Sequence, residues 1–224
     1  MKKINILSTN PQNLWNGCIL ASIAHAIMVA HYPLTACEHS WDGINYSFQD
    51  MSGVRGTISF ADKCCSAAFR DENSKRLKNK YYANALDFFE GCSREVLEIA
   101  KNETLQYLLE NVNGQNKPLI TTAFWGDEKS LFSLDTQNDM MVNGAGILER
   151  QLLEYKLSIS SWSEYYEMTA QQVDLLEFLY KRKIENPSNV LELTKTDISK
   201  IGCDDPDGLH ESKVSFNEIN IILT

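Results

Sequence analysis

The residue types needed for acyl transfer occur within the first 42 positions of the chain. Cys18 follows Gly17 at the start of an apolar segment that predicts a helix, and a helix N-terminus stabilises a thiolate through its unpaired N–H groups and its dipole. His39 could act as the base, and Asp42 could be the carboxylate that orients it. Gln12, upstream of the cysteine, occupies a place from which an oxyanion donor could act. These residues form a candidate catalytic set.

Papain-like hydrolases carry a nucleophilic cysteine at this kind of position, so a cysteine-dependent hydrolase is one hypothesis for the protein. The spacing opposes it, because one helix and one sharp turn must bring Cys18 and His39 together. His25 cannot replace His39, since seven residues along a helix place it roughly 10 Å from Cys18. The surrounding sequence matches no protease motif, and cysteine is one of the residue types most often buried for packing alone.

The sequence predicts no metal site and no cofactor. The four histidines, His25, His31, His39 and His210, lack HxxxH or HExxH spacing, and the six cysteines include no CxxC pair. The acidic loop 204–208 resembles a calcium loop in composition, but it lacks the closing glutamate of an EF-hand. Walker and GxGxxG motifs are also missing, so nucleotide binding has no support.

Composition indicates a globular protein of ordinary kind. Hydrophobic residues make up 43% of the 224 positions and charged residues 23%, and no linker or repeat divides the chain. We therefore expect a single globular domain over residues 1–224. The N-terminus lacks the apolar core of a secretory signal, and the most apolar stretch, 17–32, contains two histidines and is too short for a membrane span. With cysteines scattered as in a reducing compartment, these features predict a cytoplasmic protein with no membrane partner.

The charge balance bears on the class of partner. The net charge is −9 and the isoelectric point is about 5.0. Nucleic acid is disfavoured as a direct partner, because binding phosphates requires a concentrated basic surface. An acidic surface favours basic protein partners and accelerates their encounter, although solubility alone is a simpler explanation of the charge.

Alternating residues predict a β-sheet in the first half of the chain. Ile44, Tyr46 and Phe48 alternate with polar residues, and the run 54–60 repeats the pattern. We expect three antiparallel strands within 39–70, joined by two tight turns. A hairpin over 119–135 should lie beside this meander and give a sheet of about five strands, with one dry face and one wet face.

Helical periodicity dominates the ends of the chain. Helices are expected over 13–30, buried on most sides, over 83–90 and over 93–112, with Asn113-Gly114 ending the third. The C-terminal third should be mostly helical, with an apolar stripe over 148–166, a capping box at Thr169 and a final strand. The fold class is therefore α+β, a mainly antiparallel sheet packed by N-terminal and C-terminal helices.

The aromatic residues of the sheet suggest a binding surface. Trp41 falls on the face opposite Tyr46, and Trp and Tyr on a sheet serve either as core or as binding anchors. The candidate binding residues are Trp41, Asp42, Asn45, Arg55 and Trp125. The favoured hypothesis is a non-enzymatic, acidic, cytoplasmic protein-binding module, an immunity-like inhibitor or neutraliser of a basic protein, with the Cys18 hydrolase as the alternative. The sequence predicts neither the identity of the partner nor an oligomeric state.

Overall fold

The computed structural model describes residues 3–78 and 84–224, and the chain divides into two compact units. The sheet unit consists of Met1–Asn13 and Ile44–Glu149, and the helical unit consists of Leu14–Gly43 and Arg150–Thr224. Both units combine segments that are distant in sequence. Strands and helices together confirm the predicted α+β class, whereas the single domain over 1–224 stays a prediction.

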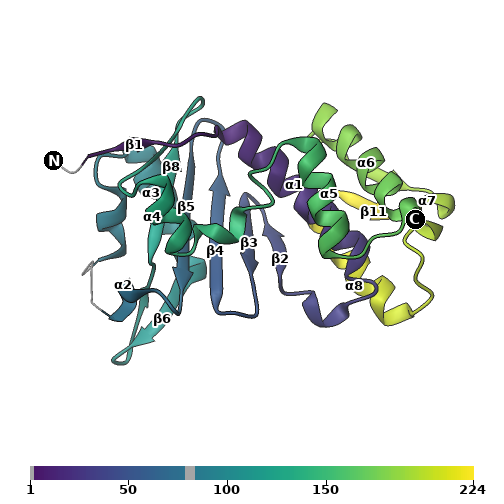
Figure 1. Ribbon diagram of the computed structural model, residues 1–224, viewed down its shortest axis with the longest axis horizontal. Helices are drawn as coiled ribbons and strands as arrows, with labels where there is room; N and C mark the ends of the chain where they lie inside the picture. Colours follow the sequence, from purple (N-terminus) through teal and green to yellow (C-terminus); the bar gives the residue numbers. More distant parts are fainter. Residues whose placement is uncertain (1–2, 79–83) are drawn as a thin grey trace. The chain divides into compact units, whose positions relative to one another are not determined.

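The sheet unit is built on antiparallel strands (Figure 1). The strands of its large sheet lie in the order β1 (Asn5–Ile6), β9 (Leu131–Ser133), β8 (Thr122–Gly126), β5 (Cys65–Asp71), β4 (Val54–Phe60) and β3 (Asn45–Gln49). Residues 39–70 hold four strands and not the predicted three, because β2 (His39–Asp42) is a separate strand. The predicted antiparallel meander is confirmed for β3, β4 and β5, and the predicted hairpin β8–β9 lies beside it, since β5 pairs with both β4 and β8. Within this unit the sheet exceeds the predicted five strands because the start of the chain adds β1 alongside β9.

A row of aromatic rings covers one face of this sheet. The ring of Phe48 lies 5.0 Å from that of Tyr46 and 6.0 Å from that of Phe69, and Phe69 lies 5.6 Å from Phe124. Gly56 on β4 is paired with Phe48 on one side and Phe69 on the other. A Cβ at Gly56 would lie 2.5 Å from the Phe69 ring, so the glycine makes room for the aromatic side chain.

The opposite face of the sheet is also buried, and the expectation of a wet face was wrong. The 3₁₀ helix η2 (Ala85–Phe89), helix α3 (Arg94–Asn102) and the 3₁₀ helix η3 (Thr104–Leu108) form a hydrophobic cluster with Ala68, Ala123 and Trp125. Asn45, predicted to face water, is 3% exposed, whereas Ile44, predicted to be core, is 39% exposed. Polar strand residues are tolerated in this layer because they hydrogen-bond one another, as between the Ser59 hydroxyl and Asn45 Oδ1 at 2.6 Å.

The helices of this unit depart from the predicted boundaries. The helix predicted over 93–112 ends at Asn102, and the strands β6 (Leu109–Val112) and β7 (Gln115–Pro118) follow η3. Asn113 and Gly114 have φ values of 54° and 80°, so the left-handed pair forms a hairpin turn and does not end a helix. The first position of the helix predicted over 83–90 lies outside the described residues. The described part of this unit also contains the helical segments α2 (Lys75–Lys78), α4 (Gln137–Val142) and η4 (Ala145–Leu148).

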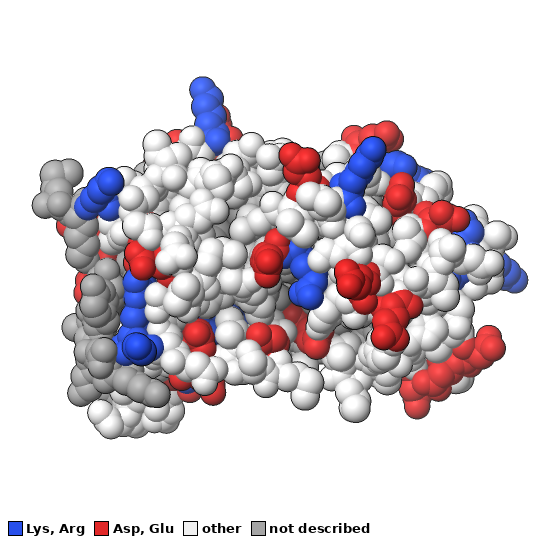
Figure 2. Space-filling model, in the orientation of Figure 1, with Lys and Arg blue, Asp and Glu red and all other residues white. Residues whose placement is uncertain are grey.

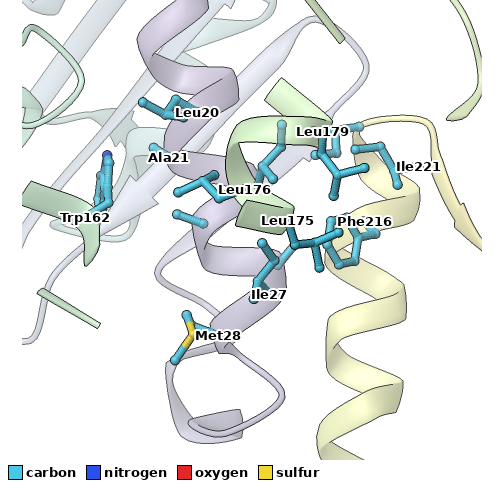
Figure 3. Packing of buried hydrophobic residues seen from close by; sticks show 14 of the residues in the cluster. Leu20, Ala21, Ile27, Met28, Trp162, Leu175, Leu176, Leu179, Phe216 and Ile221 are labelled. Atoms are coloured by element: carbon cyan, nitrogen blue, oxygen red, sulfur yellow. The ribbon is translucent and has the colours of Figure 1, made fainter. Parts of the chain in front are cut away.

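Helix α1 (Pro11–Met28) supplies the core of the helical unit, which it enters at Leu14. Its buried positions run unbroken from Gly17 to Met28, as its uniformly apolar sequence predicted. Helices α5 (Tyr155–Tyr165), α6 (Ala170–Glu185) and α8 (Pro206–Glu218) pack against it. Figure 3 shows side chains of α6 and α8 gathered beside Ile27, among them Leu175, Leu176, Leu179 and Phe216.

Short elements complete the helical unit. They are η1 (Pro33–Thr35), β2 (His39–Asp42), α7 (Lys195–Ser199) and the parallel strand pair β10 (Leu191–Leu193) and β11 (Ile221–Leu223). The predicted C-terminal helices, final strand and capping box are confirmed, with Thr169 and Gln172 each satisfying a backbone N–H of the other. The helix expected from position 148 begins only at Tyr155. Within the described ranges, no helix combines the length and the apolar character that a membrane crossing requires.

Candidate functional site

A cluster of titratable side chains lies inside the helical unit. His25 stands in the last turn of α1, and the chain returns through η1 so that Glu38 and His39 lie beside it at the start of β2. The two imidazole rings are 4.9 Å apart, and only 1% of His25 and 8% of His39 is exposed. One ligand atom from each of His25, Glu38 and His39 lies within 4.8 Å of the other two.

Aromatic side chains of α5 and its end surround this cluster together with Arg150. The Nδ1 atom of His25 is 3.1 Å from the Tyr166 hydroxyl, and the Trp162 ring meets His39 edge-on at 5.5 Å. The Arg150 guanidinium lies 4.2 Å from the centre of the Tyr165 ring. In and around this cluster, three buried nitrogen atoms have no hydrogen-bond partner among the residues that the structure describes: His25 Nε2, Arg150 Nε and Trp162 Nε1.

Burial dominates the electrostatics of the cluster. It lowers the pKa of His25 to about 4, against a smaller raising effect of the Ala36 backbone. Burial also holds the pKa of His39 well below 6.5, and repulsion from His25 and Arg150 lowers it further. The pKa of Tyr166 is raised well above 10, first by burial and then by the Glu38 carboxylate. Both imidazoles are therefore neutral at pH 7 and each keeps a nitrogen lone pair.

Sequence reasoning missed this cluster because its members come from two elements with no motif spacing. The spacing of 13 residues between His25 and Glu38 reflects the length of a turn, which no metal or catalytic pattern encodes. One signal was present, since His25 is a polar residue in an otherwise apolar stretch of helix, where burial without a partner is costly.

The predicted catalytic set does not occupy the expected positions. Helix α1 begins at Pro11, where the Asn10 side chain accepts a hydrogen bond from the Asn13 N–H, so Cys18 lies in the third turn and is fully buried. The prediction that Cys18 stands at a helix N-terminus was wrong. The preceding residue, Gly17, allows α1 to pack closely against the backbone of Gln151, because a Cβ at this position would lie 1.8 Å from the Gln151 carbonyl oxygen.

The other members of that set lie in different environments. Gln12 is exposed in the first turn of α1. His39 is buried against His25, as described above, and Asp42 is exposed at the end of β2. The position of Cys18 within α1 gives its thiolate no stabilisation by a helix terminus.

Three of the predicted binding residues lie in the sheet unit and are held by internal contacts. Trp125 is 4% exposed and packs 6.3 Å from Phe89, so its side chain belongs to the core. The Asn45 amide donates to Glu103 Oε2 at 2.8 Å and to the Tyr107 hydroxyl at 3.2 Å. Arg55 forms an ion pair with Glu110. Asn45 and Trp125 are thus not presented to solvent for recognition.

Trp41 and Asp42 lie in the helical unit, at the surface strand β2. The Trp41 side chain is half-buried and its Nε1 donates to the Ser22 hydroxyl at 2.8 Å. Its backbone N–H donates to Glu218 Oε2, also at 2.8 Å, which fastens β2 to the end of α8. Partial burial raises the pKa of Glu218, the Trp41 N–H lowers it and the Asp42 carboxylate raises it again. We call Trp41, Asp42 and Glu218 the acidic edge.

Charge is distributed unevenly between the units. The helical unit carries 15 carboxylates against 8 lysines and arginines, a net charge of −7, and the sheet unit carries 15 against 13, a net charge of −2. On the face drawn in Figure 2, acidic side chains outnumber basic ones over the helical unit. The acidic edge therefore belongs to the more negative part of the chain.

A pocket of about 450 Å³ opens in the sheet unit. Its wall includes Val96, Trp125 and Phe132, with Cys64 and Glu95 among the polar lining residues. Burial raises the pKa of the Cys64 thiol and Glu95 raises it further, so the thiol is protonated at neutral pH. The pocket is mainly apolar. Cys64 does not provide it with an activated nucleophile, because its thiol stays protonated.

Comparison with known proteins gives no relative: no family model matches the chain, and neither a curated protein nor a solved structure is similar to it. The helical unit combines a buried histidine cluster with an acidic edge at its surface.

Proposed function

We propose that this chain is a non-enzymatic, cytoplasmic binding module that recognises a basic protein through the acidic edge, as an immunity-like inhibitor would. The observation that carries the proposal is the electrostatic repulsion between two carboxylates, those of Asp42 and Glu218. Asp42 lies close enough to raise the pKa of Glu218, and among the described residues no Lys or Arg contributes to that pKa. A lysine or arginine from a partner would relieve this repulsion and gain two charge-assisted contacts.

The neighbouring indole suits the same partner. Trp41 is fixed at both its backbone and its ring nitrogen, so little conformational entropy is lost when a partner covers its exposed part. Aromatic anchors of this kind are enriched among the residues that dominate binding energy, and an indole face attracts Arg and Lys. The net charge of −7 on the helical unit adds long-range attraction for a basic surface.

The hydrolase alternative gains no support from geometry. The Cys18 side chain is fully buried in the core, so its thiol cannot reach a substrate as a nucleophile must. The binding hypothesis is retained in a narrower form, since Asn45 and Trp125 serve the interior and Trp41 and Asp42 are the members of the original set that define the surface site.

The proposal is tested by affinity capture with a charge-matched pair of variants. The chain and the double variant Asp42→Asn, Glu218→Gln are used as baits in lysate of the cells that make the protein, and bound proteins are identified by mass spectrometry. The control is Glu185→Gln, Glu192→Gln, which removes two exposed carboxylates of the same unit that are not members of the acidic edge.

We expect a basic protein to be captured by the unchanged chain and by the control, but not by the double variant. Titration of the identified protein should then show binding weakened about 10- to 100-fold in the double variant, as for two lost charge-assisted contacts of about 1.4 kcal/mol or less each. Equal affinities for both double variants would refute a role of the acidic edge.

A further inference from the structure

We propose that the helical unit binds one divalent transition-metal ion, with zinc as the best match, through His25, Glu38 and His39. The three residues supply two imidazole nitrogens and one carboxylate oxygen, which is an established donor set for zinc with a position left open for a fourth ligand. This inference is independent of the acidic edge and of any partner.

The distances between the ligand atoms fit an ion after a small contraction. Zinc–nitrogen and zinc–oxygen bonds of about 2.0–2.2 Å place tetrahedral ligand atoms about 3.4 Å apart. The three atoms here lie within 4.8 Å of one another, so the largest separation must shorten by at most about 1.4 Å to reach that geometry. His25 is held on the rigid helix α1, and Glu38 lies at the junction between η1 and β2, where a shift is least costly.

The state of the His25 ring points to a missing partner. The Tyr166 hydroxyl occupies Nδ1, and Nε2 is buried without a hydrogen-bond partner in the described part of the chain. A buried nitrogen without a partner costs free energy. A metal-binding histidine characteristically uses one ring nitrogen for the ion and the other for an orienting hydrogen bond, and Tyr166 can provide that bond by accepting from Nδ1–H.

Arg150 is the group that opposes the ion. The positive charge of Arg150 lowers the pKa of His39, and the same charge weakens the attraction of the cluster for a cation. The Glu38 carboxylate acts with the opposite sign and offsets this repulsion. The Arg150 Nε–H and the Trp162 Nε1–H both lack acceptors among the described residues. An anionic fourth ligand such as hydroxide or a carboxylate would balance the ion and give such donors an acceptor.

The test uses the full chain, freed of metal with a chelator and then dialysed. Cobalt(II) is titrated with its visible absorption as the signal, because the spectrum reports tetrahedral coordination, and zinc is then titrated by calorimetry. Glu38→Gln and His39→Gln remove ligands. His210→Gln, on α8, and Cys37→Ser, at the exposed neighbour of Glu38, are the matched controls.

We expect one equivalent of metal per chain, displacement of cobalt by zinc, and affinity at least tenfold lower in Glu38→Gln and His39→Gln than in the two controls. Zinc should raise the midpoint of thermal unfolding of the unchanged chain, and it should not do so for either ligand variant. If His39→Gln does not fold, the metal affinity of Glu38→Gln tests the proposal by itself, because Glu38 is only half-buried and its substitution disturbs the core less. Absence of saturable binding, equal affinity in Glu38→Gln, or loss of binding in Cys37→Ser or His210→Gln would overturn the proposal.

Discussion

The fold keeps two buried histidines of this chain neutral. Burial holds the pKa of His25 at about 4 and that of His39 well below 6.5, whereas both titrate near 6.5 when unfolded. Below pH 6.5 the unfolded chain binds protons that the native chain does not bind. Stability is therefore complete above pH 6.5 and is lost as the pH falls towards 4.

We predict that the free energy of unfolding falls by about 2 kcal/mol between pH 7 and pH 5 through His25 alone, with a further loss from His39. The measurement is urea denaturation at both pH values in the presence of a chelator. His25→Gln should reduce this difference and His210→Gln should leave it unchanged. A difference that His25→Gln leaves intact would show that His25 titrates normally in the native state.

At the scale of elements, a buried ion pair joins a short helix to the sheet. Arg76 of α2 donates to the Asp135 carboxylate through Nη1 and Nη2, at 2.6 and 2.9 Å, beyond the end of β9. The same side chain donates to the Thr121 carbonyl at 2.8 Å, and Thr122 donates to Asp135 at 2.5 Å. The two side chains are 15% and 6% exposed, so neither charge is well hydrated.

We predict that Arg76→Met lowers the free energy of unfolding by about 3–5 kcal/mol, because Asp135 is left as a buried charge without its cation. The double variant Arg76→Met, Asp135→Leu should recover much of this loss, since it removes both charges. Urea denaturation followed by circular dichroism measures both. As a control, Lys181→Met breaks the exposed pair with Glu177 on α6 and should lower the free energy of unfolding far less, because solvent screens that pair. Equal losses for Arg76→Met and Lys181→Met would contradict the prediction.

Elements with local signals were the predictable ones. The capping box at Thr169 and the alternation in 54–60 depend on near neighbours, and the structure contains both the cap and the strand. The Asn113-Gly114 pair shows the limit of such signals, because a left-handed pair can end a helix or turn a hairpin. Pairing of β6 with β7 decided between these possibilities.

At the scale of the whole molecule, the uneven charge should govern how fast a basic partner arrives. With −7 of the −9 charges on the helical unit, attraction at a distance raises the association rate and is screened by salt. We predict that raising the ionic strength from about 0.05 M to about 0.3 M slows association with the captured basic protein at least tenfold, with a much smaller change in the dissociation rate. Stopped-flow measurement with the Glu185→Gln, Glu192→Gln variant should show a shallower salt dependence. A salt-independent association rate would contradict electrostatic attraction.

Sequence by itself determined the α+β class, the three-strand meander, the hairpin beside it, the buried first helix and the acidic balance. These depend on local periodicity and composition, which the physical chemistry of neighbouring residues fixes. Tertiary structure alone decided which side chains are exposed and which come together. Asn45 and Trp125 are buried because helices cover the second face of the sheet, and His25 meets Glu38 and His39 because a turn returns β2 to the end of α1. Contacts between distant segments depend on how several faces pack at once, and no spacing in the sequence specifies that.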